Sequence, residues 1–481
     1  MTFLFYILAL SAMYQYSALL PRNIFQKTNN FYTKNNHISL SEENVRHPSN
    51  NTQGFYGLIG PNVNFFKATS LIELFTGNGV VQGVFIENGK LTFVTHIIET
   101  TKVKHETKYW AFPSNMFVLL ILGTLRMLPV SQGVANTALI HFANQTLALY
   151  ENDSPYFLDI NFKDTNIYTK NKLSIKGITS FSGHTKKVGD FLETLDYNVF
   201  NQQVIVNTLT QGMDIVQTIP VDTAYIPVVH DFISTDKYTI FIDSPLHIQI
   251  DKFFEKSMPV SLNSDMPTYI HVVNKITNDV QRFTMSDTIY AFHLINFKET
   301  EYAFTFESLQ LDELDFSSIN FHPKLRKVVI DKRTRSVSNE KNEHLEELDM
   351  DFPLKINNTH TLFSLIGPIG FYGFVICKDT KVVKKVIFED NMTIAGEPQV
   401  IVCNETPHLI GFSNQQNIDS VCMINLVDFT STFTPIPVKM TKGFHSIFIP
   451  TPHGYSLSSR ENGSNTPHKT PCENPPAFLE L

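Results

Sequence analysis

From about Gly54 onward, the chain alternates between short apolar runs and turn residues. The runs are rich in Val, Ile, Phe, Tyr and Thr, which are the residue types enriched in β-strands. Their lengths and spacing are typical of a sandwich, a barrel or a propeller. The pattern therefore predicts an all-β fold built from many short strands.

Several neighbouring runs are paired in a way that predicts β-hairpins. The clearest pair flanks Asn88-Gly89, because Asn-Gly suits the positive φ angles of a tight hairpin turn. The predicted strands are residues 80–87 with 91–98, 137–142 with 146–151, 226–234 with 238–243, 289–297 with 302–306, and then 374–377, 382–388, 400–403, 409–412 and 420–427. No βαβ alternation, GxGxxG motif or GK[ST] loop accompanies them, so a nucleotide-binding α/β fold is not expected.

Three segments depart from this strand pattern. Residues 323–350 are dense in charges of both signs, which predicts a solvated excursion between elements. Residues 451–481 turn to Pro, Ser, Asn and Gly, which predicts a disordered tail. Residues 1–20 contain an apolar core followed by small residues. They predict either a signal peptide, which would direct the chain into the secretory pathway, or an apolar segment that packs or lies on a membrane.

A further apolar run covers residues 116–128 and is closed by Arg126 and Pro129. It is shorter than the roughly 20 residues that span a bilayer. The residues alone leave two interpretations open. One is a buried core helix, and the other is a monotopic patch that enters one leaflet.

Composition narrows the classes of function. Hydrophobic residues make up 42% of the 481 residues, which is too many for a disordered chain. The net charge of −8 argues against a nucleic-acid binder, which needs a basic surface. The four cysteines include no CxxC pair, so neither a disulfide framework nor a cysteine-type zinc site is expected. An apolar tunnel and a histidine metal site would account for the 40 Phe and 17 His, but biased codon usage would also raise the Phe count.

No HExxH or similar local motif marks a metal site. Several histidines nevertheless lie within apolar strand sequence, where a buried imidazole needs a partner for its polar nitrogens. They are His184, His230, His293 and His445, and His247 and His271 pass the same test. The local pattern therefore does not select one set of ligands.

An ordered series of short motifs resembles the carotenoid cleavage oxygenase family, whose animal branch includes the retinal pigment epithelium isomerohydrolase and the β-carotene oxygenases. The motifs run from about Gly54 to Pro450. They are Leu58-Ile59-Gly60-Pro61-Asn62, Phe75-Thr76-Gly77-Asn78-Gly79, Ala135-Asn136-Thr137, Leu147-Ala148-Leu149-Tyr150-Glu151, Val229-His230-Asp231-Phe232, Phe292-His293 with Asn296 and Glu299, Gly396-Glu397-Pro398 and Gly443-Phe444-His445. Each motif is weak alone, but the ordered set is specific.

The resemblance implies a single domain over residues 54–450, a seven-bladed β-propeller with an irregular helical cap over the iron-bearing face. It implies one Fe(II) per chain on the propeller axis, with dioxygen as co-substrate. Carried over residue by residue, the ligands are His184, His230, His293 and His445. Imidazole suits iron, and ligands that converge on an axis from different strands are expected to lie far apart in sequence.

The family orients three of its four histidines through carboxylates, and the matching residues are Glu151, Asp351 and Glu397. The family usually has Glu before Phe-Pro, so Asp351 is one methylene shorter. There are three ways in which the contact to the histidine could still be made: the backbone shifts, a water molecule bridges the gap, or Glu347 makes the contact instead. Thr137 matches a residue that lies beside the open iron site in the family.

The resemblance also bears on residues 116–128. The family dips into lipid here, at the mouth of its tunnel, which favours the monotopic patch and a peripheral membrane protein. The expected contacts are Phe117, Leu119, Leu120 and Leu122. Animal members carry Pro-Asp-Pro-Cys-Lys before this helix, whereas this chain has Phe112-Pro113-Ser114-Asn115-Met116 and so lacks an acyl-cysteine anchor there.

The function implied is an Fe(II)-dependent dioxygenase that cleaves a conjugated C=C bond of a carotenoid or apocarotenoid into two carbonyl products. For an animal-like member, central cleavage of β-carotene to retinal is the expected reaction. The alternatives are a retinyl-ester isomerohydrolase on the same fold and a propeller that binds lipid or protein without catalysis. The presence of all four histidines argues against the non-catalytic alternative.

Overall fold

A computed structural model describes residues 30–40, 52–68, 70–87, 89–108, 122, 128, 132–249, 258, 260–316, 321–367, 370–378, 381–403 and 405–452. The predicted segment 1–20 and residues 453–481 of the predicted tail lie outside these ranges, as do Phe117, Leu119 and Leu120. Within the described ranges, no helix is both long enough and apolar enough to cross a membrane.

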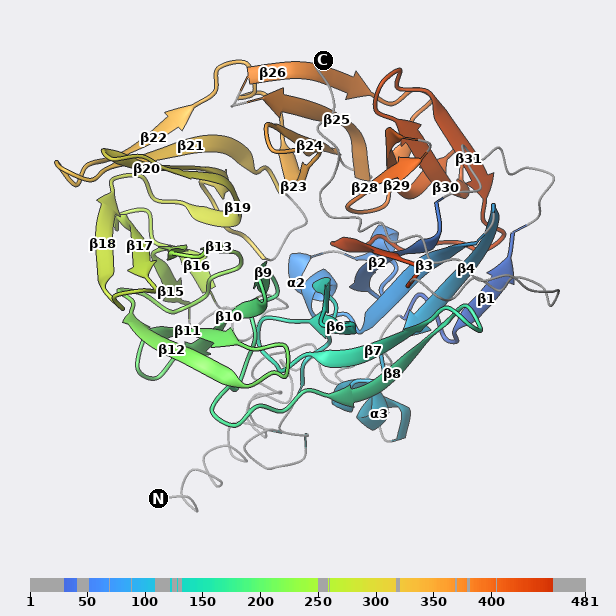
Figure 1. Ribbon diagram of the computed structural model, residues 1–481, viewed down its shortest axis with the longest axis horizontal. Coiled ribbons are helices and arrows are strands. Elements are labelled where there is room, and N and C mark those ends of the chain that lie inside the picture. The colour runs from blue at the N-terminus through green and yellow to red at the C-terminus, as the bar shows by residue number, and fades with distance from the viewer. Residues whose placement is uncertain are drawn as a thin grey trace, which may run out of the picture.

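Antiparallel sheets surround a common centre, as the blades of a propeller do (Figure 1). The sheet that closes the ring has the strand order β1 (Asn36–Ser39), β4 (Lys90–Ile97), β3 (Gly79–Glu87), β2 (Gly54–Pro61) and β32 (Ser446–Pro450). Because β2 pairs with β32, with Gly54 opposite Pro450, segments from the two ends of the described chain lie side by side. β1, which lies before residue 54, is part of this sheet through its pairing with β4.

The described part of the chain then forms four-stranded sheets in sequence order. They are β5 (Ala138–Phe142), β6 (Gln145–Leu149), β7 (Tyr156–Asn161) and β8 (Asn166–Lys172); β9 (Lys186–Val188), β10 (Phe191–Asn198), β11 (Gln203–Leu209) and β12 (Ile215–Asp222); β13 (Ile233–Ser234), β14 (Tyr238–Asp243), β17 (Thr268–Asn274) and β18 (Val280–Met285); and β19 (Tyr290–Glu299), β20 (Ala303–Leu311), β21 (Lys324–Asp331) and β22 (Val337–Lys341).

A nine-stranded sheet completes the ring. Its two halves meet through β27 (Thr393–Ile394), which pairs with both β25 and β29. The halves are β23 (Met350–Lys355), β24 (His360–Gly367), β25 (Gly370–Lys378) and β26 (Lys381–Ile387), and β28 (Gln399–Cys403), β29 (Thr406–Gln415), β30 (Ile418–Asn425) and β31 (Ser431–Pro435). The predicted all-β propeller is confirmed, and the number of seven blades stays a prediction.

Short elements lie outside these sheets. They are the 3-10 helix η2 (Phe65–Lys67), the helices α2 (Leu71–Phe75) and α3 (Thr101–Lys108), and the strand pair β15 (Leu246–Ile248) and β16 (Val260–Leu262). Leu71 and Leu74 of α2 are buried in an apolar cluster with Phe292, the residue before His293. A short helix therefore packs beside the segment that carries one of the predicted ligands.

Apolar side chains hold neighbouring sheets together. Ile240 and Ile270 from one sheet pack in the same cluster as Phe306 and Val328 from the next. These side chains are at most 1% exposed, and full burial of each stabilises the fold by about 1.5–3 kcal/mol. The continuous apolar runs seen in the sequence thus reflect strands in sheets that pack face to face, such as β2, which is buried along its whole length.

The Asn-Gly hairpin is confirmed. Glu87 pairs with Lys90, so the loop between β3 and β4 has two residues, and Gly89 has a φ of 78°. Two other predictions need correction. Of residues 226–234 only Ile233–Ser234 form a strand. Residues 323–350 are no solvated excursion, because they contain β21 and β22, and Leu325, Arg326, Val328 and Ile330 of β21 are buried.

Candidate metal centre

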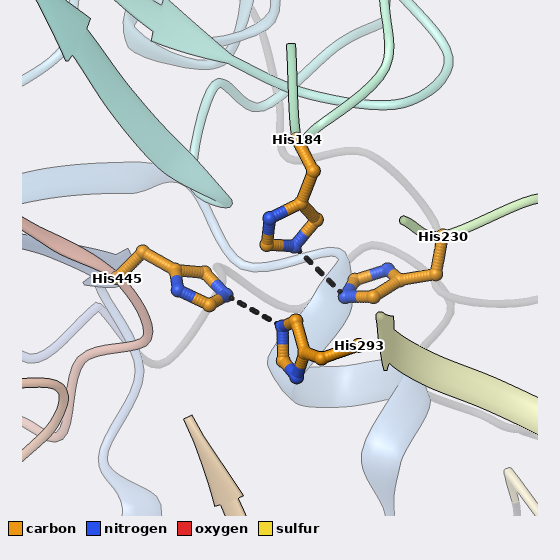
Figure 2. A group of neighbouring side chains, drawn as sticks. All are labelled: His184, His230, His293 and His445. Carbon is orange, nitrogen blue, oxygen red and sulfur yellow. Dashed lines mark hydrogen bonds between the residues drawn. The ribbon is translucent and has the colours of Figure 1, made fainter. Parts of the chain in front are cut away.

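The four histidines predicted as ligands converge on one point (Figure 2). His184 comes just before β9, His230 just before β13, His293 lies within β19 and His445 comes just before β32. Each imidazole therefore comes from a different sheet. Their candidate ligand nitrogens all lie within 4.8 Å of one another, and the four rings are buried or half-buried.

Local backbone structure directs these side chains inward. Asp196 accepts hydrogen bonds from the N–H groups of Thr179 (2.9 Å) and Ser180 (3.0 Å), which fixes the loop that leads to His184. The Tyr197 hydroxyl donates to the carbonyl of Val229 at 2.6 Å, next to His230. The pairing of β19 with β20 shifts register between Ala291 and His293, and such a bulge re-aims a side chain.

The nitrogens face one another in two pairs. His184 Nε2 lies 3.1 Å from His230 Nε2, and His293 Nε2 lies 3.3 Å from His445 Nε2 (Figure 2). The opposite ring nitrogens contact carboxylates. His230 Nδ1 lies 2.8 Å from Glu151 Oε1, and His445 Nδ1 lies 3.4 Å from Glu397 Oε2. His293 Nδ1 contacts Asp351 Oδ1 directly.

This arrangement suits a cation. A carboxylate on Nδ1 keeps the imidazole proton there and leaves a lone pair on Nε2. The Nε2 lone pairs of His293 and His445 then point at each other across 3.3 Å. Two lone pairs at that separation repel unless a proton or a metal ion lies between them. The four histidines, three of them oriented by carboxylates, therefore form a set of nitrogen donors. Such a set fits a transition-metal ion, because imidazole suits zinc, copper, iron and nickel.

The pKa directions of two of the rings, His184 and His445, support this interpretation. Burial and the surrounding imidazoles hold the pKa of His184 well below its ordinary value. Burial also lowers the pKa of His445, against the opposing effect of the Glu397 carboxylate. For His293, burial alone would lower the pKa, but Asp351 outweighs it and raises the pKa. Two of the rings are thus held neutral, as metal ligation requires.

Thr137 lies next to the carboxylate that orients His230. Its hydroxyl donates to Glu151 Oε2 at 3.2 Å. A Cβ at Gly183 would lie 2.8 Å from Glu151 Oε1 and 2.8 Å from Thr137 Cγ2. Glycine before His184 therefore lets Glu151 and Thr137 approach this closely.

Aromatic rings surround the histidines. The Phe292 ring centroid lies 4.9 Å from that of His230, and the Phe352 centroid lies 4.8 Å from that of His445. Phe352 has a φ of 54°, a conformation that bulky residues rarely adopt and that clusters at functional sites. The surroundings of the histidine cluster are therefore apolar on at least these two sides.

The structure also places residues that sequence reasoning did not single out. Gly183 directly precedes the predicted ligand His184, and Phe352 directly follows Asp351. Their position next to predicted site residues is the sequence feature that could have identified them. Leu122, predicted to contact lipid, is 6% exposed. His271, which passed the same apolar test as the ligands, stacks on Phe241 with ring centroids 4.9 Å apart and lies outside the histidine cluster.

Comparisons with known proteins extend these observations. A family model described as retinal pigment epithelial membrane protein matches residues 48–362. Carotenoid 9,10(9′,10′)-cleavage dioxygenase 1 of Arabidopsis thaliana is 24% identical over 457 residues, which cover 82% of this chain and 84% of that protein. Lignostilbene-α,β-dioxygenase isozyme III of Sphingomonas paucimobilis is 24% identical over 279 residues, which cover 55% of each protein.

Solved structures share the fold. The cobalt-substituted apocarotenoid oxygenase of Synechocystis superposes with a TM-score of 0.72 at 16% identity, over 88% of this chain and 98% of that one. The lignostilbene dioxygenase of Pseudomonas brassicacearum gives a TM-score of 0.71 at 16% identity, over 89% and 99%. The family match over residues 48–362, on a propeller with four convergent histidines, shows that the chain belongs to the carotenoid oxygenase family, the family of the retinal pigment epithelial membrane protein.

Proposed function

We propose that this chain is an Fe(II)-dependent dioxygenase that cleaves a C=C bond of a carotenoid or apocarotenoid into two carbonyl products. The observation that carries the proposal is the cluster of four imidazoles, whose candidate ligand nitrogens lie within 4.8 Å of one another. Relatives named as carotenoid cleavage dioxygenases support the reaction class.

The residues that would hold the iron are His184, His230, His293 and His445, one ion per chain. When bound, iron(II) supplies the activation of dioxygen that oxidative cleavage of an alkene needs. The protein's own contribution is to present the ligands. Glu151, Asp351 and Glu397 retain the Nδ1 protons of their histidines, so that each Nε2 atom is free to bind.

The apolar rings suit a polyene substrate. Phe292 and Phe352 lie against the histidine rings, where they would exclude water and hold a conjugated chain beside the metal. No protein nucleophile is required, and the ring contacts would position one double bond. The names of relatives refer to carotenoids, an apocarotenoid and lignostilbene, which are conjugated molecules.

The bond that is cleaved is a finer part of the proposal. We expect central cleavage of β-carotene to retinal, whereas several relatives are named for cleavage at the 9,10 (9′,10′) bonds. The two reactions give aldehydes of different length, so chromatography of the products separates them.

Peripheral contact with a membrane also belongs to the proposal, because carotenoids dissolve in lipid and an apolar surface patch would reach them there. Leu119 and Leu120 are the residues to test, since Leu122 is buried. The paired change Leu119→Ser with Leu120→Ser should reduce co-sedimentation with phosphatidylcholine vesicles. Unchanged sedimentation would contradict the membrane contact.

The deciding experiment combines metal analysis with product analysis of the purified full chain. We expect about one iron per chain and conversion of β-carotene to aldehydes that absorb at shorter wavelength. His230→Ala should lose both iron and activity, and the matched control His247→Ala should retain both. Iron-free wild-type protein that leaves carotenoids unchanged would contradict the proposal, and formation of retinol from a retinyl ester would favour the isomerohydrolase instead.

A further inference from the structure

Asp231, the residue after His230, is a buried carboxylate that contacts none of the four imidazole rings through a described hydrogen bond. Its side chain is 3% exposed, and Oδ1 lies 2.5 Å from the Lys186 ammonium. Oδ1 also accepts the N–H of Phe232 at 2.8 Å, and Oδ2 accepts the N–H of Leu294 at 2.9 Å. The carboxylate thus has a charged partner and two backbone donors.

The positions of these partners are informative. Lys186 is two residues after His184, Asp231 is one residue after His230, and Leu294 is one residue after His293. A single carboxylate therefore joins the segments that carry three of the four histidines. Glu151, Asp351 and Glu397 differ from it because each contacts a histidine ring.

The three segments belong to separate sheets. β9, β13 and β19 begin three different antiparallel sheets, and no strand pairing joins those sheets within the described residues. Side-chain contacts between sheets must therefore set the separation of the histidines. A charge-assisted hydrogen bond is stronger and more directional than apolar contact, so Asp231 is well placed to fix that separation.

We propose that Asp231, neutralised by Lys186, is a positioning residue that sets the spacing of the His184, His230 and His293 nitrogens for metal binding. The inference rests on the proposed function, because it takes the histidines to be metal ligands. It adds a fourth carboxylate, whose hydrogen bonds go to Lys186 and to backbone N–H groups rather than to an imidazole.

A general stabilising contact between sheets is the alternative, and the chain contains a matched control for it. Glu193 is 1% exposed on its side chain and pairs with Lys275 at 2.7 Å. It also accepts the hydroxyl of Thr239 at 2.6 Å, across the same pair of neighbouring sheets. The backbone of Glu193 pairs with that of Lys186 in the β9–β10 ladder. The hydrogen bonds and the ion pair described for its carboxylate involve none of the segments His184–Lys186, His230–Asp231 or His293–Leu294, so this carboxylate joins sheets without joining ligands.

The test is titration of metal-free full-length protein with Co²⁺, followed by visible absorption and by competition with a chelator. Thermal unfolding of the same metal-free proteins measures stability. Asp231→Asn should weaken cobalt binding about 10–100-fold, as loss of a carboxylate behind a metal site typically does, and should change the cobalt spectrum. Lys186→Met should weaken it in the same direction. Glu193→Gln should lower the melting temperature and leave both cobalt readouts unchanged.

The outcomes separate the alternatives. One outcome would overturn the inference. In it, Asp231→Asn and Lys186→Met bind cobalt with the affinity and spectrum of wild type, and their melting temperatures fall as in Glu193→Gln. Asp231 would then be only a stabilising contact between sheets. If Asp231→Asn does not fold, Lys186→Met decides by the same readouts. Wild-type protein that binds no cobalt would overturn the inference and the proposed metal site together, whereas normal binding by wild type and Asp231→Asn alike removes only the inference.

Discussion

The carboxylate of Asp351 contacts Nδ1 of His293 directly, although aspartate is one methylene shorter than the glutamate that the family resemblance predicts at this position. Asp351 Oδ1 also accepts the N–H of Phe352 at 2.8 Å. The pairing of β23 with β24 shifts register between Asp351 and Leu354, so the strand bulges where the shorter side chain reaches the imidazole. The structure thus favours a direct contact over a bridging water or Glu347.

Replacement of Asp351 tests whether the charge or the length of this side chain matters. Asp351→Asn keeps the size but removes the charge that makes His293 a better donor, so iron affinity should fall about 10-fold. Asp351→Glu adds a methylene at a residue that is 1% exposed, so it should cost about 1–3 kcal/mol of stability by overpacking. Chelator competition and urea denaturation measure the two effects. Equal iron affinity in wild type and Asp351→Asn would contradict the role of the charge.

Gly183 is expected to be intolerant of a methyl group. In Gly183→Ala the new Cβ would lie 2.8 Å from Glu151 Oε1, so Glu151 should move away from His230 and iron affinity should fall about 10-fold. Gly212→Ala is the control, because the atom nearest to its added Cβ is 3.3 Å away and belongs to the side chain of Asp214. Metal content after dialysis against a chelator compares the two variants. Full iron retention in Gly183→Ala would show that Glu151 has more room than its contacts indicate.

Acid should destabilise the fold through His96, which is 4% exposed. Burial lowers the pKa of His96 to about 4 from an ordinary value of 6.5. Between these values the unfolded chain binds a proton that the folded chain does not. The stability from neutral His96 is therefore complete above pH 6.5 and is lost as the pH falls toward 4, by about 3 kcal/mol.

Urea denaturation between pH 7 and pH 4.5 measures this loss. His96→Asn should remove most of this contribution to the pH dependence, whereas substitution of the exposed His37 by Asn should leave it in place. The same slope in His96→Asn and wild type would assign the acid sensitivity to other groups.

Phe352 is expected to contact the substrate. It is half-buried, and its ring centroid lies 4.8 Å from that of His445 and 5.6 Å from that of His293. Phe352→Leu should keep the iron but lower kcat/KM for an apocarotenoid about tenfold, which corresponds to about 1.4 kcal/mol of lost apolar contact. Phe388→Leu is the control, because Phe388 is also half-buried but packs on Phe374. Loss of iron from Phe352→Leu would instead make Phe352 a support for the ligands.

The sequence predicts strands best where two local signals agree, namely apolar runs and a turn dipeptide between them. The β3–β4 hairpin combines two apolar runs with the turn dipeptide Asn-Gly, and the structure confirms it. β21 was missed because Lys324 and Lys327 are only half-buried and make the segment look solvated, while Leu325 and Val328 alternate with them as buried residues. In a strand near the rim of a propeller, the charged face dominates the composition even though the other face is packed.

The candidate site was predictable only in part, for a different physical reason. The order of the family motifs identifies the four histidines. Apolar surroundings alone do not identify them, because His271 has the same surroundings and lies outside the cluster. The contact between Asp231 and Lys186 joins different sheets. Such a contact depends on how the blades pack against each other. The spacing of apolar residues and the residue types in turns describe single strands and hairpins, so they do not predict contacts between blades.

The pairing of β2 with β32 determines when the site can form. His445 immediately precedes β32. The next residue, Ser446, is the first residue of that strand and lies opposite Leu58 of β2. During synthesis the chain carries three of the four imidazoles long before the fourth is made. Closure of the ring and completion of the ligand set are then a single late event. A chain cut between β31 and β32 would lose the strand that closes the ring and the last histidine of the cluster at the same time.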